Sequence, residues 1–482
     1  MGRGDRRHTR APWRSRLAGW LPVAVVLVVV ATAFASFQLD VARRLGWAPA
    51  DSSDPAAVAP PPGLELPALS SPPAVAAALA ADTAVDPAKV RRALAPYASD
   101  KDLGKHRVIA VGSLDGSVWE DNGAGRFIPA STMKLLTGTA ALESLGPDRT
   151  FRTRVVAGKR TKDIVLVGGG DPFLTRTPPT GSSYPPQADV RTLARATAKD
   201  LRADGRHTVR LRFDDSLFTG PSVNPHWPAS YVPDAVVPPI TALWVDKGIK
   251  QDGWGFESDP SAAAASVFAA ELEKAGITVL GTPERATAPD GAGELAAVES
   301  APVWQIVDRV VSVSDNEGAE ILSHQVGVEE RGDGSFAGGA SAVRTVLKRL
   351  GVNLADTVIR DGSGLSREDR LTTQALLDVL SVDAKAKHPE LRPVISALPA
   401  AGFTGSMTGR LGDSDDAGLG RVRAKTGTLT GVHGLAGVTT DRDGNVLAFV
   451  FLADKVKVPK TLGARDALDD LTAALAACRC SS

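Results

Sequence analysis

The sequence predicts a mixed α/β (α+β) protein in which an antiparallel sheet is flanked by helices and the chain is interrupted by a large β-rich insertion. Paired apolar segments joined by turn residues indicate antiparallel strands near both ends of the globular part. Helical patterns come before and after residues 152–296. That stretch has short strand patterns, many glycines and prolines, and no long helical pattern before Ser261.

The N-terminal region predicts export. Residues 1–16 form a basic segment with six arginines and one acid, and residues 17–37 carry no charge over a length that can cross a bilayer as a helix. Arginines before the apolar stretch favour a single-pass membrane anchor with the N-terminus in the cytoplasm and the rest of the chain outside it. Secretion after signal cleavage is the alternative, because Ala33-Phe34-Ala35 fits a cleavage site. Residues 38–82 are rich in Pro and Ala and predict an extended linker.

Composition argues against several kinds of partner. The net charge is zero and no basic stripe with stacking aromatics is present, so nucleic acid is not an expected partner. The seven histidines form no close pair, so the sequence implies no metal and no other cofactor. Cys478 and Cys480 lie in a tail, residues 478–482, that we expect to be frayed. They could pair with each other, bind a partner or have no role.

The globular part divides into three predicted segments. The first, residues 83–151, has a helix at 87–95, a hairpin formed by strands near 108–111 and 118–119 around the turn Asp115-Gly116, and a helix from Ser131 to Leu145. The insertion, residues 152–296, has strands at 163–167 and 209–213 and a helix at 261–275. The last segment, residues 297–477, has helices at 303–313, 317–328 and 462–476, a further helix starting near Thr372, and strands at 434–440 and 446–452.

Ser131 and Lys134 are the first candidate catalytic pair. Their i, i+3 spacing at the start of a helix places hydroxyl and amine on one face. A lysine whose neutral form is accessible can remove the serine proton. Unpaired N–H groups at the helix N-terminus can stabilise an oxyanion. Alone, however, Ser-x-x-Lys is also compatible with a capping serine and a solvated lysine.

Two further motifs follow. Ser314-Asp315-Asn316 lies between two helices, where a hydroxyl can relay a proton and an amide can hold a carbonyl, although helix capping explains the same residues. Lys425-Thr426-Gly427-Thr428 lies on a predicted strand. There a lysine can hold a carboxylate, and a glycine lets substrate backbone pair along the strand edge.

Together the three motifs resemble those of the penicillin-interacting serine enzymes, in order and in element type. The large insertion between the first two narrows the resemblance to the low-molecular-mass class C penicillin-binding proteins, peptidase family S13, which are D-Ala-D-Ala carboxypeptidases and endopeptidases. Gly169-Gly170-Asp171-Pro172, the loop Asp361–Ser366 and Lys425–Leu429 also resemble family patterns. The resemblance covers residues 83–475. The chain departs from the family in two ways. Its insertion is shorter than in the larger members, and a membrane anchor is not a general feature of the family.

This resemblance implies a transpeptidase/β-lactamase-like domain and a role for each motif residue. Neutral Lys134 takes the proton of Ser131, which attacks the penultimate D-Ala carbonyl to form an acyl-enzyme. Ser314 passes a proton to the leaving nitrogen, and Asn316 holds the peptide amide. The backbone N–H groups of Ser131 and Thr428 form the oxyanion hole.

The resemblance also implies the substrate contacts. Lys425, Thr426 and Thr428 receive the terminal carboxylate, and Leu365 contributes to substrate binding. The expected partners are peptidoglycan stem peptides ending in D-Ala-D-Ala, with β-lactam antibiotics as inhibitors. A β-lactamase or esterase on the same scaffold and a non-catalytic peptidoglycan-binding protein are the alternatives; turnover of a chromogenic cephalosporin would identify the first.

Overall fold

The computed structural model describes residues 85–114, 118–121, 125–412, 414 and 416–480. They belong to the second of the two units into which the chain divides, residues 78–482. The predicted basic segment, anchor and linker, and the turn Asp115-Gly116, lie outside the described residues. Within the described ranges, no helix has the length and apolar character needed to cross a membrane.

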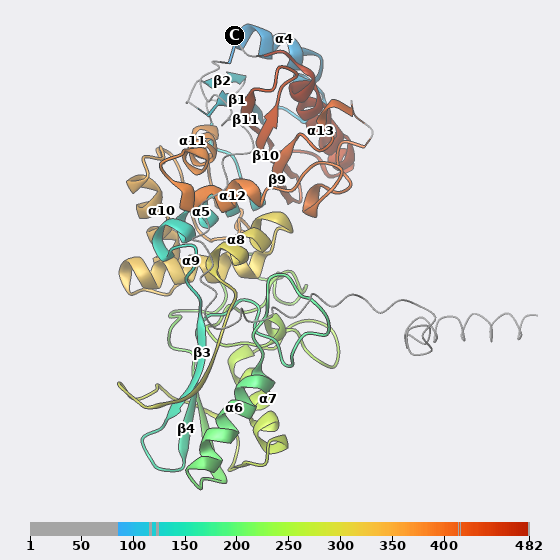
Figure 1. Cartoon of the computed structure of the whole chain (residues 1–482). Coiled ribbons are helices and arrows are strands. Elements are labelled where there is room, and N and C mark those ends of the chain that lie inside the picture. Colours follow the sequence, from blue (N-terminus) through green and yellow to red (C-terminus); the bar gives the residue numbers. More distant parts are fainter. Residues whose placement is uncertain (1–84, 115–117, 122–124, 413, 415, 481–482) are drawn as a thin grey trace, which may run out of the picture. The chain divides into compact units, whose positions relative to one another are not determined.

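A five-stranded antiparallel sheet is built from both ends of the globular part, in the order β2-β1-β11-β10-β9 (Figure 1). This confirms the predicted hairpin and the C-terminal strands. Asp441 and Asn445 close the turn between β10 and β11 through an N–H···O bond of 2.9 Å. The strands are β1 (Arg107–Ser113), β2 (Val118–Asp121), β9 (Arg423–Leu429), β10 (Val432–Thr440) and β11 (Val446–Ala453).

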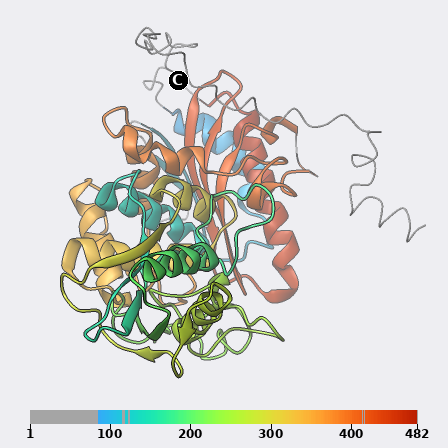
Figure 2. The ribbon, with the colours of Figure 1, turned by 60° about the horizontal axis from the view of Figure 1, so that its bottom comes forward.

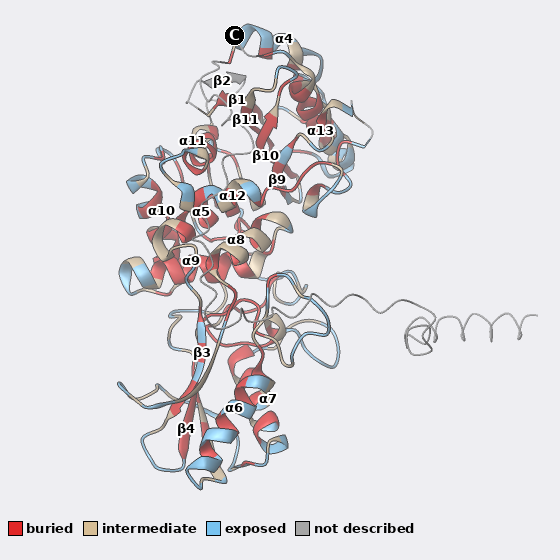
Figure 3. Cartoon of the chain, in the orientation of Figure 1, coloured by how far each residue is buried: buried red, intermediate tan, exposed pale blue. Residues whose placement is uncertain are grey.

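Alternating residues of these strands supply two hydrophobic cores (Figure 3). On one face, Ile109, Leu435 and Phe451 pack with the first and last helices, α4 and α13. On the other, Ala110 and Val450 pack with the helices that carry the first two motifs. Figure 2 shows α4 and α13 together beside the strands. The sheet therefore holds the predicted site between the helical layer and its edge strand β9.

The helices outside the insertion confirm the predicted pattern and add α10 and α12. Helices α9, α10 and α11 begin after Asp315, Ser335 and Thr372, whose side chains accept backbone N–H groups as N-caps. The helices are α4 (Pro87–Ala98), α5 (Met133–Leu145), α8 (Val303–Ser312), α9 (Asn316–Arg331), α10 (Phe336–Arg349), α11 (Thr373–Ala384), α12 (Arg392–Ser396) and α13 (Thr461–Ala477).

The insertion carries a six-stranded sheet, in the order β6-β5-β4-β3-β8, with β7 paired to β5. The expectation of no long helix before Ser261 was wrong, because α6 (Val190–Ala203) packs its apolar stripe with α7 (Pro260–Lys274) on one sheet face. Its strands are β3 (Arg152–Ala157), β4 (Asp163–Val167), β5 (Thr208–Asp214), β6 (Thr278–Val279), β7 (Glu284–Arg285) and β8 (Glu294–Glu299).

The C-terminal cysteines are not in a frayed segment. Cys478 and Cys480 form a disulfide with each other, the first of the three possibilities left open by the sequence. Cys480 is buried in the core formed with α4 and α13, and its carbonyl accepts the N–H of Asp86 at 2.8 Å. The expectation of a frayed tail failed because this segment has an apolar core to pack on.

Candidate active site

Ser131 occupies a tight turn before α5. The turn is a short 3-10 segment, Ala130–Thr132, fixed by two bonds from Thr132 to the Pro129 carbonyl, from its N–H at 3.2 Å and its hydroxyl at 2.8 Å. Ala130 has φ of 45°, a left-handed conformation that is uncommon outside glycine. Such strain persists only where the surroundings hold it. It leaves Ser131 half-buried at the N-terminal end of the helix, as the sequence predicts.

Lys134 is fully buried and binds three groups, two of which come from distant parts of the chain. Its Nζ donates to Ser131 Oγ at 3.0 Å, to Asn316 Oδ1 at 2.8 Å and to the Ser363 carbonyl at 2.7 Å. The structure thus joins the first motif to the second. Burial lowers the pKa of Lys134 to about 8, against the opposing pull of nearby carboxylates. A neutral amine in contact with the Ser131 hydroxyl can therefore serve as a base near physiological pH.

The Ser363 carbonyl is held in place by a buried acid that sequence reasoning missed. Glu320 accepts the N–H groups of Ser363 at 2.8 Å and Gly362 at 3.1 Å. Burial, and then the charge of Asp361, raise the pKa of Glu320 to about 8. Its position four residues after Asn316, on the same face of α9, was the available signal. Glu320 is a positioning residue for the loop that holds Lys134.

Two residues of the insertion brace the active-site loops. Trp227 Nε1 donates to Asp361 Oδ2 at 2.7 Å, and Asp361 in turn accepts the N–H of Gly364 at 2.7 Å. Lys247 pairs with both Asp315 and Glu317, the latter at 3.1 Å. These contacts fix the second motif, and no sequence pattern predicted them.

The backbone of the second motif places Ser314 at a sharp corner. Ser314 has φ of 65°, and Asp315 Oδ1 accepts the Gly318 N–H at 2.9 Å to begin α9. Ser314 is partly exposed, two residues before the Asn316 that touches Lys134. The predicted rigid corner between two helices is therefore present.

Strand β9 carries the third motif along the sheet edge. Lys425 is fully buried, and its Nζ donates to the Thr426 carbonyl at 2.9 Å. Burial, and then repulsion by Lys134, hold the pKa of Lys425 well below its usual range. The Thr426 hydroxyl donates to Ser406 Oγ at 3.1 Å, and Thr428 is exposed. Of these residues the threonines, and not Lys425, are accessible to a substrate.

Leu365 lies in the core rather than at an open surface. It packs in a cluster with Trp227, Trp244, Ile321 and Phe336, most of its surface buried. The Tyr231 hydroxyl reaches the Leu365 carbonyl at 3.5 Å. Any contribution of this residue to substrate binding would therefore involve the backbone of its loop.

Two glycines let these loops approach the Ser131 turn. A Cβ on Gly364, which has φ of 81°, would lie 1.8 Å from the Ala130 carbonyl oxygen. A Cβ on Gly427 would lie 2.8 Å from the Pro129 carbonyl oxygen. Both positions require glycine because the backbone of the nucleophile turn occupies the space of a side chain.

We expect Gly364→Ala to destabilise the protein more than Gly146→Ala, its matched control. Gly146 has φ of 82° and ψ of 149°, but a Cβ on it would meet no atom of the described chain within 4 Å, so alanine adds only backbone strain, about 1–3 kcal/mol. Alanine at 364 adds overpacking of about 1–3 kcal/mol or more. Urea unfolding would measure both, and equal losses would contradict the close approach.

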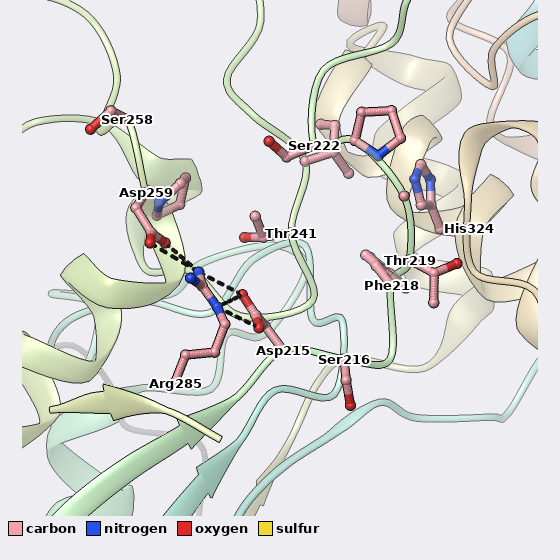
Figure 4. A pocket seen from close by; sticks show the side chains of 14 residues that line it. Asp215, Ser216, Phe218, Thr219, Ser222, Thr241, Ser258, Asp259, Arg285 and His324 are labelled. Carbon is pink, nitrogen blue, oxygen red and sulfur yellow. Dashed lines mark hydrogen bonds and ion pairs between the residues drawn. The ribbon is translucent and has the colours of Figure 1, made fainter. Parts of the chain in front are cut away.

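A cavity in the insertion and a cluster of three titratable residues contain none of the predicted site residues. A cavity of about 360 Å³ in the insertion is crossed by Arg285, which pairs with Asp215 at 3.0 Å and Asp259 at 2.9 Å (Figure 4). Glu143, His388 and Glu390 lie close enough together to share a metal ion. In the part of the chain that the structure describes, His388 binds Glu390 at 3.0 Å and Glu143 lies 3.7 Å from Arg349.

Comparisons with a family model, with related sequences and with solved structures find carboxypeptidases and a penicillin binding protein. The D-Ala-D-Ala carboxypeptidase 3 (S13) family model matches residues 90–252 and 255–475. A carboxypeptidase of Mycobacterium tuberculosis is 35% identical over 416 residues, covering 83% of this chain and 87% of the relative. Carboxypeptidase DacB of Mycolicibacterium smegmatis is 32% identical over 485 residues, covering 98% of this chain and 99% of the relative. Penicillin binding protein 4 of Haemophilus influenzae shares the fold, with a TM-score of 0.66 at 21% identity over 78% of this chain and 98% of that one.

Proposed function

The chain belongs to the D-Ala-D-Ala carboxypeptidase 3 (S13) family, and from that membership we propose a serine-type D-Ala-D-Ala carboxypeptidase in which Ser131 is the nucleophile. The observation that carries the assignment is the contact of 3.0 Å between Ser131 Oγ and the buried Nζ of Lys134. A hydroxyl beside an amine whose pKa is lowered to about 8 is an activated nucleophile.

Acylation follows from these positions. Neutral Lys134 accepts the proton as Ser131 Oγ attacks the carbonyl of the penultimate D-Ala. Asn316, already bonded to Lys134 at 2.8 Å, holds the peptide amide beside them. The backbone N–H groups of Ser131 and Thr428 stabilise the negative oxygen of the tetrahedral intermediate.

Release of the terminal D-Ala completes the first half of the reaction. Ser314 donates its proton to the departing nitrogen and regains one from Lys134, which thereby returns to its neutral form. Water then hydrolyses the acyl-enzyme. Thr426 and Thr428 receive the carboxylate of the leaving residue, while buried Lys425 fixes the strand through its bond to the Thr426 carbonyl. Cleavage of cross-links by the same steps stays a prediction.

β-Lactams are the proposed inhibitors. A solved structure of the Haemophilus influenzae protein, 23% identical to this chain, is a complex with a β-lactam. Attack of Ser131 on the lactam ring would form the same kind of ester, but the leaving nitrogen stays tethered to the acyl group. Deacylation is then slow.

The site of action is outside the cytoplasm, where peptidoglycan stem peptides are found. We propose that residues 17–37 are retained as the anchor and that residues 38–82 give the enzyme reach from the membrane. Mass determination of the N-terminal peptide from the membrane fraction would test this. A mature chain that starts after Ala35 would support the secreted alternative.

The proposed activity is tested by release of D-Ala from an N-acylated peptide ending in D-Ala-D-Ala, detected with a D-amino acid oxidase coupled assay. We expect one D-Ala released for each peptide consumed, and inhibition by benzylpenicillin. A protein that instead binds peptidoglycan without releasing D-Ala would favour the non-catalytic alternative, and rapid hydrolysis of a chromogenic cephalosporin would favour the β-lactamase.

The pH dependence of acylation should report on Lys134. Because the neutral amine is the base and its pKa is about 8, its neutral fraction grows as pH rises toward that value. The second-order rate of acylation by a fluorescent penicillin should therefore rise about tenfold from pH 6 to pH 7 and level off above pH 8. A rate that is flat or falls over this range would contradict Lys134 as the base.

A further inference from the structure

A cavity of about 270 Å³ borders the strand that carries the third motif. Thr426 and Thr428 of β9 line one side of it, and His433 of β10 and Arg465 of α13 line others. Thr428 and His433 are direct partners in the antiparallel ladder, so their side chains lie on the same face of the sheet. The cavity therefore begins where the substrate carboxylate is proposed to bind.

The charge of this cavity is positive. Arg410 also lines it, but its guanidinium is neutralised by Asp469, which it contacts through Nε at 2.9 Å and Nη2 at 2.6 Å. Arg465 donates through Nη2 to the Gly409 carbonyl at 2.7 Å. Among the residues that the structure describes, no carboxylate lies within 4.0 Å of the Arg465 guanidinium. Arg465 is thus a cation without a carboxylate partner among the described residues, and it lines the same cavity as Thr426 and Thr428 of β9.

His433 adds a polar group without a partner. Its side chain is buried, with 5% exposure, and Nε2 has no hydrogen-bond partner within the described chain. Buried polar atoms of this kind are normally satisfied, so His433 Nε2 can bind a polar group that enters the cavity. Burial, and then the charge of Arg410, lower the pKa of His433, so the ring is a neutral donor or acceptor.

Lys425 cannot provide this contact itself. It is fully buried, its Nζ donates to the Thr426 carbonyl at 2.9 Å, and burial holds its pKa well below the usual range of a lysine. A carboxylate held by Thr426 and Thr428 would still need a cation within reach, because charge-assisted bonds are the strong ones in such recognition. Arg465 is the cation that lines the same cavity as both threonines.

We propose that Arg465, with His433, forms an anion subsite that selects substrates bearing a carboxylate on the residue that leaves. This inference rests on the proposed function, since it assigns the cation that recognises the terminal D-Ala. Arg465 would bind one carboxylate oxygen through N–H groups other than the one given to Gly409. His433 Nε2 would bind the other, alongside the Thr428 hydroxyl.

Two thioesters with the same N-acyl-D-alanyl group test the subsite. One has thioglycolate as leaving group and carries the carboxylate; the other has methyl thioglycolate and is neutral. Thiol release gives kcat/KM for each, and the acid-to-ester ratio measures recognition of the carboxylate. Because a hydrogen bond to a charged group is worth roughly a factor of ten to one hundred, Arg465→Gln should lower this ratio about tenfold or more.

Two further variants separate recognition from folding. Arg465→Lys keeps the charge and should recover part of the ratio. Arg92→Gln, on the exposed side of α4, is the matched control and should leave the ratio unchanged. An unchanged ratio in Arg465→Gln, or equal losses on both thioesters, overturns the subsite while leaving the carboxypeptidase assignment intact. Failure of the wild-type protein to turn over either thioester contradicts the proposed function, and the subsite with it.

Discussion

Ser131→Ala should give a folded protein that neither releases D-Ala nor forms a covalent adduct with a β-lactam. The substitution removes the only atom proposed to attack the carbonyl, and loss of a serine nucleophile lowers turnover by about 10⁴-fold or more. Stability should change little, because the hydroxyl loses one hydrogen bond, to Lys134 at 3.0 Å. That bond is worth about 1 kcal/mol.

The measurement is D-Ala release together with gel detection of a fluorescent penicillin. Thermal unfolding of the same samples establishes that the variant is folded. Ser266→Ala is a suitable control, because Ser266 is exposed on α7 and donates to the Ala262 carbonyl of its own helix at 2.9 Å, away from the reacting atoms. Covalent labelling that persists in Ser131→Ala would show that another residue is the nucleophile.

Lys134→Met should lower the acylation rate about 10²–10⁴-fold, the usual contribution of a general base. Methionine fills much of the buried space, but Asn316 Oδ1 and the Ser363 carbonyl lose their donor. Each unsatisfied acceptor costs about 1–3 kcal/mol, so the melting temperature should fall as well. The rise of the rate toward pH 8 should disappear, which a purely structural loss would not cause.

The acylation rate of this variant is measured by stopped flow with a fluorescent penicillin between pH 6 and pH 9. Lys199→Met, on the exposed side of α6, removes a lysine without touching the site and is the control. If Lys134→Met kept its rate within tenfold and retained the same inflection, a different group would have to be the base.

The motifs were predictable because each depends on local chemistry. Ser131 and Lys134 are one helical turn apart, so their contact follows from spacing alone. The strand of Lys425 was predicted from the two strands that follow it at 434–440 and 446–452, and β9 does pair with the first of them, β10. That the three motifs meet in one site was predicted from the family resemblance, not from any pattern in the residues.

The supporting contacts were not predictable from the sequence. Trp227 and Lys247 reach the active-site loops from the insertion, and nothing in a local pattern says which distant acid a side chain will meet. The same holds for burial of Lys425, since an isolated strand lysine is usually exposed. Helix α6, by contrast, was predictable: apolar residues repeat at helical spacing after the N-cap Asp189, and residues 190–203 contain no glycine or proline.

Intact-mass spectrometry of the purified protein after incubation with benzylpenicillin, followed by peptide mapping, is the most direct test of Ser131 as the acylated nucleophile. We expect one persistent penicilloyl group, attached to Ser131. No adduct with intact drug, or an adduct on any other residue, would contradict this mechanism; no adduct with hydrolysed drug would mean that the protein is a β-lactamase.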